Sequence, residues 1–286
     1  MGHRFINVEP WKCTDDEYFH GDHYGSSSIA KALGFDGPGE KTSELGNAAH
    51  VAVLQPGIFE QRVITPPAEV LPGSGDGQRA RRKVFDYENR DKIILSAALY
   101  DKALSMRDAI RSHGLVGPHL DRKEINFEQS FRAIDSETGL QVRVRCDALS
   151  PGNIDDMKMS KSPGYAAFRR AIRSYAYHIQ AALYVDVLSA FLGRVPRFHW
   201  IVVGNAPPYR VGIYEAHSEW IEWGRKYYSA GLSILAASRV RGRSPIPWWS
   251  SRRLVVDGPT EHEMAEMDVD VSLHERHAAA MSGGVQ

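Results

Sequence analysis

Cysteine is scarce in this sequence, long hydrophobic runs are missing, and neither sign of charge is in excess. Its 286 residues include only Cys13 and Cys146, which suggest neither a disulfide framework nor a zinc site, so we expect a protein of the reducing cytoplasm. No apolar run approaches the roughly 18 residues of a membrane span, and the first residues are too polar for a signal peptide. The formal net charge of zero argues against a protein that binds nucleic acid with its whole surface.

Basic residues nevertheless gather at three places along the chain. These are Arg79, Arg81, Arg82 and Lys83, then Arg169, Arg170 and Arg173, and then the run from Arg239 to Arg253. A run of like charges is more often a solvated face than a binding site. Each cluster is therefore a candidate contact for an acidic partner only if other residues point to one.

Periodicity and capping signals predict where helices and strands lie. Apolar residues recur at helical spacing in some segments and alternate with polar residues in others. Residues 66–82 are rich in Pro, Gly and Arg, so we expect an exposed, mobile loop there. We expect helices within 23–34, 42–56, 96–113, 162–192 (with a break near Ser174) and 219–238, and strands within 124–135, 140–149, 154–159, 197–204 and 209–216.

The order of these elements predicts the architecture. Helices come first, then three strands, a helix, two strands and a last helix, as in a mixed sheet flanked by helices in a single α/β domain. We expect an N-terminal extension over residues 1–25, the domain over 26–258, and an acidic tail over 259–286. The tail lacks a convincing apolar face, so it is expected to be ordered only if a partner holds it.

The segment NIDDMKMSK, residues 153–161, places two aspartates just before a lysine on a predicted strand. Because side chains alternate between the two faces of a strand, Asp156 shares a face with Lys158, whereas Asp155 points to the other face. Asp147 lies on the preceding predicted strand. Two neighbouring strands can therefore bring Asp147, Asp156 and Lys158 together at one edge of the sheet.

Two carboxylates that converge with an ammonium group have a chemical use. Their oxygens bind a hard cation such as Mg²⁺. The cation polarises a phosphate and lowers the pKa of a bound water, while the lysine neutralises the charge that develops on the phosphate oxygens. The alternative is a surface salt bridge at a hairpin, worth less than about 1 kcal/mol, and the short D-x-K pattern alone does not decide between the two.

The helix predicted after this strand carries an amide on an aromatic stripe. Tyr177, Gln180 and Tyr184 are three and four residues apart, so they lie on one helical face. Such an amide is either an exposed group beside partly buried rings or a member of a site.

Taken together, three segments form a recognisable series: GNAAH (46–50), RCDALSPGNIDDMK (145–158) and QAALY (180–184). They resemble the successive G-x-x-x-H, D…D-x-K and Q-x-x-x-Y motifs of RecB-type nucleases in the PD-(D/E)XK superfamily. More closely, the chain resembles the nuclease domain of exodeoxyribonuclease VIII and its phage relatives, from about Ser26 to about Pro247. The resemblance implies an α/β, restriction-endonuclease-like core in residues 26–258, with a mixed central sheet flanked by helices.

The resemblance also implies a role for each matching residue. The candidate metal ligands are the motif histidine, the two motif aspartates and a strand glutamate: His50, Asp147, Asp156 and Glu128. The candidate catalytic residues are Asp147, Asp156, Lys158, Gln180 and Tyr184. The candidate DNA contacts are the two residues of the helix motif and the arginines of the first basic cluster: Gln180, Tyr184, Arg79, Arg81 and Arg82.

The sequence departs from the pattern of the family at two places. Met159-Ser160 replaces the usual pair of threonines after D-x-K, and Cys146 stands where proline is common before Asp147. Neither change removes a candidate metal ligand, so we expect the activity to be intact.

The implied function is a Mg²⁺-dependent exonuclease, with Mn²⁺ as a second possible cofactor, that digests linear double-stranded DNA from its ends in phage-type recombination or repair. The resemblance further implies a homo-oligomeric ring around the DNA and a single-strand annealing protein as partner, with no membrane involved. A ring suits a neutral chain, since only its channel needs to be basic. The alternatives are an endonuclease or single-strand nuclease on this fold, and a non-catalytic DNA-binding protein.

Overall fold

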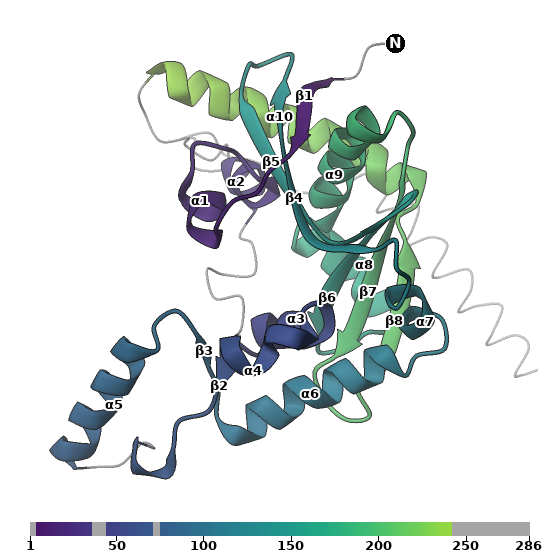
Figure 1. Ribbon diagram of the computed structural model, residues 1–286. Helices are drawn as coiled ribbons and strands as arrows, with labels where there is room; N and C mark the ends of the chain where they lie inside the picture. The colour runs from purple at the N-terminus through teal and green to yellow at the C-terminus, as the bar shows by residue number, and fades with distance from the viewer. Residues whose placement is uncertain (1–3, 36–43, 71–74, 242–286) are drawn as a thin grey trace, which may run out of the picture. The chain divides into compact units, whose positions relative to one another are not determined.

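A six-stranded mixed sheet forms the centre of the molecule (Figure 1). The structure, a computed structural model, describes residues 4–35, 44–70 and 75–241. The strand order is β1-β4-β5-β6-β7-β8, and β6 and β7 pair in parallel whereas the other neighbours pair antiparallel. The strands are β1 (Phe5–Pro10), β4 (Asn126–Asp135), β5 (Gln141–Ser150), β6 (Asn153–Ser160), β7 (Arg197–Gly204) and β8 (Val211–Glu215).

Helices pack on both faces of this sheet and divide the core in two. On one face the core includes Ile154, Trp200 and the apolar residues of the helices α2, α8, α9 and α10. On the other face the core includes Met157, Ile201 and the apolar residues of the helices α3, α6 and α7. The helices are α1 (Asp15–His20), α2 (Ser26–Ala32), α3 (Glu44–Leu54), α4 (Phe59–Arg62), α5 (Asp76–Glu88), α6 (Ala97–Arg111), α7 (Val116–Leu120), α8 (Tyr165–Ser174), α9 (Tyr177–Leu192) and α10 (Ser218–Arg241).

The central strand β7 illustrates why the sequence forms this sheet. In RFHWIVVG, Phe198, Trp200 and Val202 face the α9 side, and Ile201 and Val203 face the α3 and α6 side. A strand that is covered by helices on both faces is apolar at nearly every position. The expected mixed sheet flanked by helices is confirmed, with each of its five predicted strands in place.

The N-terminal segment adds elements that the sequence pattern did not indicate. β1 pairs with β4, with an irregular register between Ile6 and Glu9, and Asn7 has a φ of 53°. This interruption breaks the alternation that would mark a strand. Residues 5–10 therefore extend the central sheet, while the boundary at residue 25 stays a prediction. The predicted boundary at 258 and the tail lie outside the described residues.

The expected mobile loop over residues 66–82 is wrong in its second half. The 3₁₀ helix η2 (Ala68–Val70) lies within it, and α5 begins at Asp76 after Gly75 as N-cap. The Pro and Gly residues that favoured a loop lie before α5 or in its first turn. The Arg, Ala and Lys residues that follow favour a helix. The flanking strands β2 (Val63–Ile64) and β3 (Ile93–Ile94) pair in parallel.

The predicted break in the long helical region is confirmed. α8 ends at Ser174, and Ala176 precedes α9 with a φ of 56°, a conformation that an L side chain rarely adopts. The predicted helical region begins at residue 162, whereas α8 begins at Tyr165 with Gly164 as its N-cap. None of the helices described here is long and apolar enough to span a bilayer.

Candidate active site

Asp147 lies where β5 and β6 separate. The β5–β6 ladder pairs Ala148 with Asp155 and continues toward the hairpin turn, but its pairing stops at this point. Beyond it, the Met157 amide donates to Asp147 Oδ2 at 2.7 Å. The carboxylate therefore replaces a ladder partner for this amide, and its other oxygen remains available for a ligand.

Glu128 approaches Asp147 from the neighbouring strand β4. Its neighbours Phe127 and Gln129 pair with Ala148 and Cys146, which places Glu128 opposite Asp147. Glu128 has a φ of 51°, which costs a non-glycine residue on the order of 1–3 kcal/mol. Such strain is typical of residues that a functional site holds in a particular direction.

His50 completes this group from helix α3. Its Nε2 is 3.0 Å from the Met157 carbonyl oxygen, a contact that requires a proton on Nε2, and its Nδ1 is 3.6 Å from Asp147 Oδ2. Ligand atoms of His50, Glu128 and Asp147 all lie within 4.8 Å of one another. The hydrogen bond to the backbone orients the imidazole, as a second-shell contact does for a metal-binding histidine. We refer to these three residues as the metal cluster.

Asp156, Lys158 and Gln180 form a closed ring of contacts beside the metal cluster. Lys158 Nζ is 2.6 Å from Asp156 Oδ2 and donates to Gln180 Oε1 at 3.0 Å. Gln180 Nε2 in turn donates to Asp156 Oδ1 at 2.6 Å. The aromatic side chain of Tyr177 lies under the Lys158 ammonium, and its centroid is 4.8 Å from Nζ. Strand parity thus correctly predicts which aspartate meets the lysine.

The electrostatics of the site favour a cation. Burial and then the charge of Asp147 raise the pKa of Glu128 to about 7. Burial, partly offset by Lys158, and the charge of Asp147 raise the pKa of Asp156 to about 6. Burial opposes the charge of Lys158, but Asp156 and its other neighbours outweigh it and raise its pKa. The carboxylates therefore repel one another, and a divalent cation would relieve that repulsion.

Asp155 points to the opposite face of the sheet, as strand parity predicts. Its oxygens contact His119 Nε2 at 2.7 Å and His199 Nδ1 at 3.1 Å. The carboxylate is buried and connects β6 to α7 and β7. Asp155 therefore anchors the strand that presents Asp156 and Lys158, a role that the sequence alone did not indicate.

Tyr184 is buried rather than exposed to a substrate. It is 5% exposed, its hydroxyl accepts from the Arg145 amide at 3.3 Å, and it hydrogen-bonds the side chain of Tyr18. These contacts join α9 to β5 and α1. The predicted contact of Tyr184 with DNA stays a prediction.

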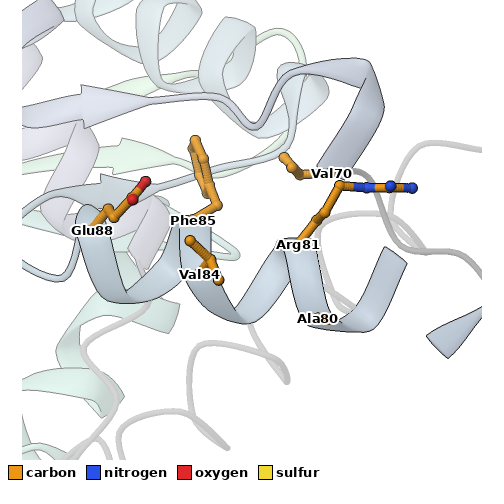
Figure 2. A pocket seen from close by; sticks show the side chains of 6 residues that line it. All are labelled: Val70, Ala80, Arg81, Val84, Phe85 and Glu88. Carbon is orange, nitrogen blue, oxygen red and sulfur yellow. The ribbon is translucent and has the colours of Figure 1, made fainter. Parts of the chain in front are cut away.

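The arginines of the first basic cluster lie on α5, away from the contacts of the metal cluster. Arg79 and Arg82 pair within the helix with Asp76 and Asp86, at 3.5 and 2.7 Å. Figure 2 shows Phe85 and Arg81 on the side of α5 that is turned toward Val70, where α5 and η2 line a hollow. No residue of α5 is buried. The role of Arg79, Arg81 and Arg82 in DNA binding stays a prediction.

A mixed sheet with a D…D-x-K set where two strands separate, backed by a glutamine on α9, defines the PD-(D/E)XK class of nuclease fold and site. Residues 36–247 match the family described as PDDEXK-like domain of unknown function (DUF3799). The chain belongs to this family. The closer resemblance to exodeoxyribonuclease VIII stays a prediction.

One solved structure supports the same fold. It is a "Putative exonuclease" from Eubacterium rectale, with a TM-score of 0.54 and 12% sequence identity. The alignment covers 88% of this chain and 97% of that one. At this identity the likeness concerns the fold alone. A search of curated proteins finds no match to this chain.

Glu128→Gln is expected to stabilise the metal-free protein above neutral pH. A carboxyl whose pKa rises from 4.5 to about 7 on folding keeps its proton in the folded state, so stability is lost as the pH rises from 4.5 to 7. The glutamine amide does not ionise, so the free energy of unfolding of the variant should exceed that of the parent by roughly 1–3 kcal/mol at pH 8. Thermal unfolding in EDTA at pH 4.5 and pH 8 measures it.

The exposed Glu124→Gln serves as control for this experiment. It removes the same type of charge two residues before β4 begins. Its melting curve should follow that of the parent at both pH values. An equal or lower unfolding temperature for Glu128→Gln than for the parent at pH 8 would contradict the buried, repulsive environment of Glu128.

Proposed function

We propose that the protein is a metal-dependent nuclease that hydrolyses phosphodiester bonds of DNA. The single observation that carries the proposal is the closed ring of Asp156, Lys158 and Gln180 beside the metal cluster. Membership of a PDDEXK-like family supports it. An isolated salt bridge would need neither the bridging amide of Gln180 nor the strained glutamate.

The donor set of the site fits a divalent cation. Carboxylate oxygens suit Mg²⁺, and the imidazole nitrogen of His50 is also compatible with Mn²⁺. We infer that His50, Glu128 and Asp147 hold the cation and that Asp156 lies within reach of it. A cation bound there supplies positive charge that polarises the phosphate and lowers the pKa of a water nucleophile.

The side chains of the chain itself orient this chemistry. The Lys158 ammonium is fixed by Asp156 and Gln180, so its charge is available without rearrangement where negative charge grows on the phosphate oxygens. Gln180 accepts from the lysine and donates to the aspartate, which keeps both at a constant separation. The Met157 backbone fixes Asp147 and His50 through its amide and its carbonyl.

The proposed substrate is linear double-stranded DNA, digested from its ends. This preference rests on the resemblance of the motifs to exodeoxyribonuclease VIII, and the name of the structural neighbour agrees with it. We further propose a homo-oligomeric ring, a single-strand annealing protein as partner, and a place in phage-type recombination. An endonuclease, a single-strand nuclease and a non-catalytic binding protein are the alternatives.

Digestion of three DNA forms tests the proposal. Linear, nicked-circular and closed-circular duplexes are incubated with the purified protein in Mg²⁺, Mn²⁺ or EDTA. Lys158→Ala and Asp156→Ala are assayed beside the parent. We expect loss of linear DNA alone, only with metal and only with the parent.

Each other outcome selects an alternative. If the circles are cut as well, the chemistry stands and the dependence on ends is wrong. If no duplex is digested although a single-stranded oligonucleotide in the same buffer is, the proposed substrate is wrong. If DNA is bound but never cut, the protein is a binding protein on a nuclease fold and the proposal fails at catalysis.

A further inference from the structure

Asp15, at the start of α1, connects two arginines from distant parts of the chain. Its Oδ1 is 2.6 Å from Arg145 Nη1 on β5, and its Oδ2 is 3.1 Å from Arg62 Nη2 on α4. One carboxylate thus binds two guanidinium groups with separate oxygens. Burial of Asp15 favours its neutral form, but the hydrogen bond and charge of Arg145 and the charge of Arg62 outweigh burial and lower its pKa.

Arg145 is held in place by contacts other than Asp15. Its Nε donates to Ser130 Oγ at 2.9 Å, and its guanidinium lies 3.9 Å from the centroid of the Tyr18 ring. The side chain is 16% exposed. A guanidinium that is fixed by a hydroxyl and an aromatic ring keeps its position when its anionic partner leaves, so it is preorganised to bind another anion.

Arg145 lies next to the metal cluster. Arg145 is two residues before Asp147 on β5, and its partner Ser130 is two residues after Glu128 on β4. The charges of both Arg145 and Asp15 contribute to the pKa of Glu128. Arg62 ends α4, which follows α3, the helix of His50. Arg145 therefore lies beside the cluster, and Asp15 brings Arg62 to the same carboxylate.

The chemistry of the pair matches a phosphate. Two guanidinium groups that converge on separate oxygens of one anion form the arrangement that recognises carboxylates and phosphates. A nucleic acid strand that places one phosphate at the metal cluster carries further phosphates on either side of it, and arginine side chains are common contacts for such phosphates. Asp15 supplies the same type of anion from within the chain.

We propose that Arg145 and Arg62 bind a phosphate of the DNA substrate, and that Asp15 occupies this position in the free protein and is displaced when DNA binds. The inference rests on the proposed nuclease function and names the phosphate contact of that site. α1 is suited to the exchange because its residues other than Tyr18 are exposed where they are described. Tyr18 is buried and keeps the helix attached, whereas the side chain of Asp15 is 53% exposed.

Asp15→Asn tests the exchange, because it removes the competing anion with little change in shape. Binding of a short fluorescent duplex is measured in Ca²⁺, which is used to hold the site without rapid cleavage. We expect the affinity to rise about threefold to tenfold, the range for loss of an ion pair with two partners. Inorganic phosphate should also inhibit DNA binding by Asp15→Asn at a lower concentration than it inhibits DNA binding by the parent.

Two further variants separate competition from the loss of one negative charge. Asp16→Asn removes the same charge from the same turn of α1, and its affinity should rise clearly less. Arg62→Gln should weaken binding, and the gain from Asp15→Asn should be smaller in the Arg62→Gln background, where Asp15 competes for Arg145 alone. A general electrostatic effect would instead give a gain of the same size in the double variant.

The outcomes also distinguish this inference from the proposed function. Equal affinities for Asp15→Asn and Asp16→Asn, or a gain of the same size in the Arg62→Gln background, would overturn the inference while metal-dependent cleavage by the parent remains. A lower unfolding temperature for Asp15→Asn without tighter binding would assign the residue a purely structural role. Absence of DNA cleavage by the parent would overturn the proposed function itself.

Discussion

Lys158→Ala is expected to lower the single-turnover rate of DNA cleavage by about 100- to 1,000-fold, the usual loss when one group that stabilises transition-state charge is removed. The ammonium is the only member of the Asp156–Lys158–Gln180 ring that is cationic, and both of its partners fix it in position. DNA binding should change by less than about tenfold, since one charge among many phosphate contacts is lost.

Lys161→Ala is the matched control for this variant. Lys161 is exposed, three residues beyond Lys158, and follows the end of β6. Its removal should leave the cleavage rate within about twofold of the parent, because exposed substitutions away from a site have small effects. A Lys158→Ala rate within tenfold of the parent would remove the lysine from the proposed mechanism.

The same substitution has a second expected consequence. Without the ammonium, Asp156 keeps its burial and its repulsion by Asp147, so its pKa should rise further above about 6. The protonated carboxyl then binds a cation less well. The cleavage rate of Lys158→Ala at pH 7 and pH 9 separates the loss of the ammonium from the protonation of Asp156. Only the part of the rate that is lost through protonation of Asp156 recovers as the pH rises.

Asp147→Asn is expected to abolish the binding of the cation and, with it, cleavage. The substitution removes a charge from the metal cluster but retains an oxygen that can accept from the Met157 amide. Because loss of a contact behind a ligand already costs about 10- to 100-fold in metal affinity, loss of the ligand itself should cost at least about 100-fold. Calorimetric titration with Mn²⁺ measures this loss.

Thermal unfolding gives an independent measure for the same variant. Mg²⁺ at about 100 times its dissociation constant should stabilise the parent by about 2.7 kcal/mol and leave Asp147→Asn unchanged. In EDTA the variant should be at least as stable as the parent, since the repulsion with Glu128 is reduced. Asp121→Asn, at an exposed surface ion pair with Arg111, is the control. An Mg²⁺-dependent shift in Asp147→Asn equal to that of the parent would contradict the assignment.

Much of the site was predictable because it depends on local periodicity. The period of two along β6 places Asp156 with Lys158 and separates both from Asp155. The period of a helix places Gln180 and Tyr177 on one face of α9, and both meet the lysine. These relationships follow from backbone geometry alone, so they can be read without knowing the fold.

Contacts between distant segments were not predictable in the same way. Asp15 meets Arg145 across 130 positions of sequence, and β1 joins the sheet by pairing with β4. Tyr184 fits the helical stripe, yet its hydroxyl is turned to the backbone of β5. Nothing local distinguishes a tyrosine that faces a substrate from one that buttresses a strand. The burial of the side chain depends on the packing of the whole domain.

The parallel pairing of β6 and β7 has a consequence for when the site can act. A parallel pair requires the chain to cross from one end of the sheet to the other, and here α8 and α9 make that crossing. Gln180 lies within the crossing. A chain that is still being synthesised and ends at β6 therefore carries Asp147, Asp156 and Lys158 without the amide that contacts the last two. The set of contacts around Lys158 is therefore complete only once α9 has docked, so under the proposed function a fragment that ends before α9 lacks the partner that fixes the ammonium.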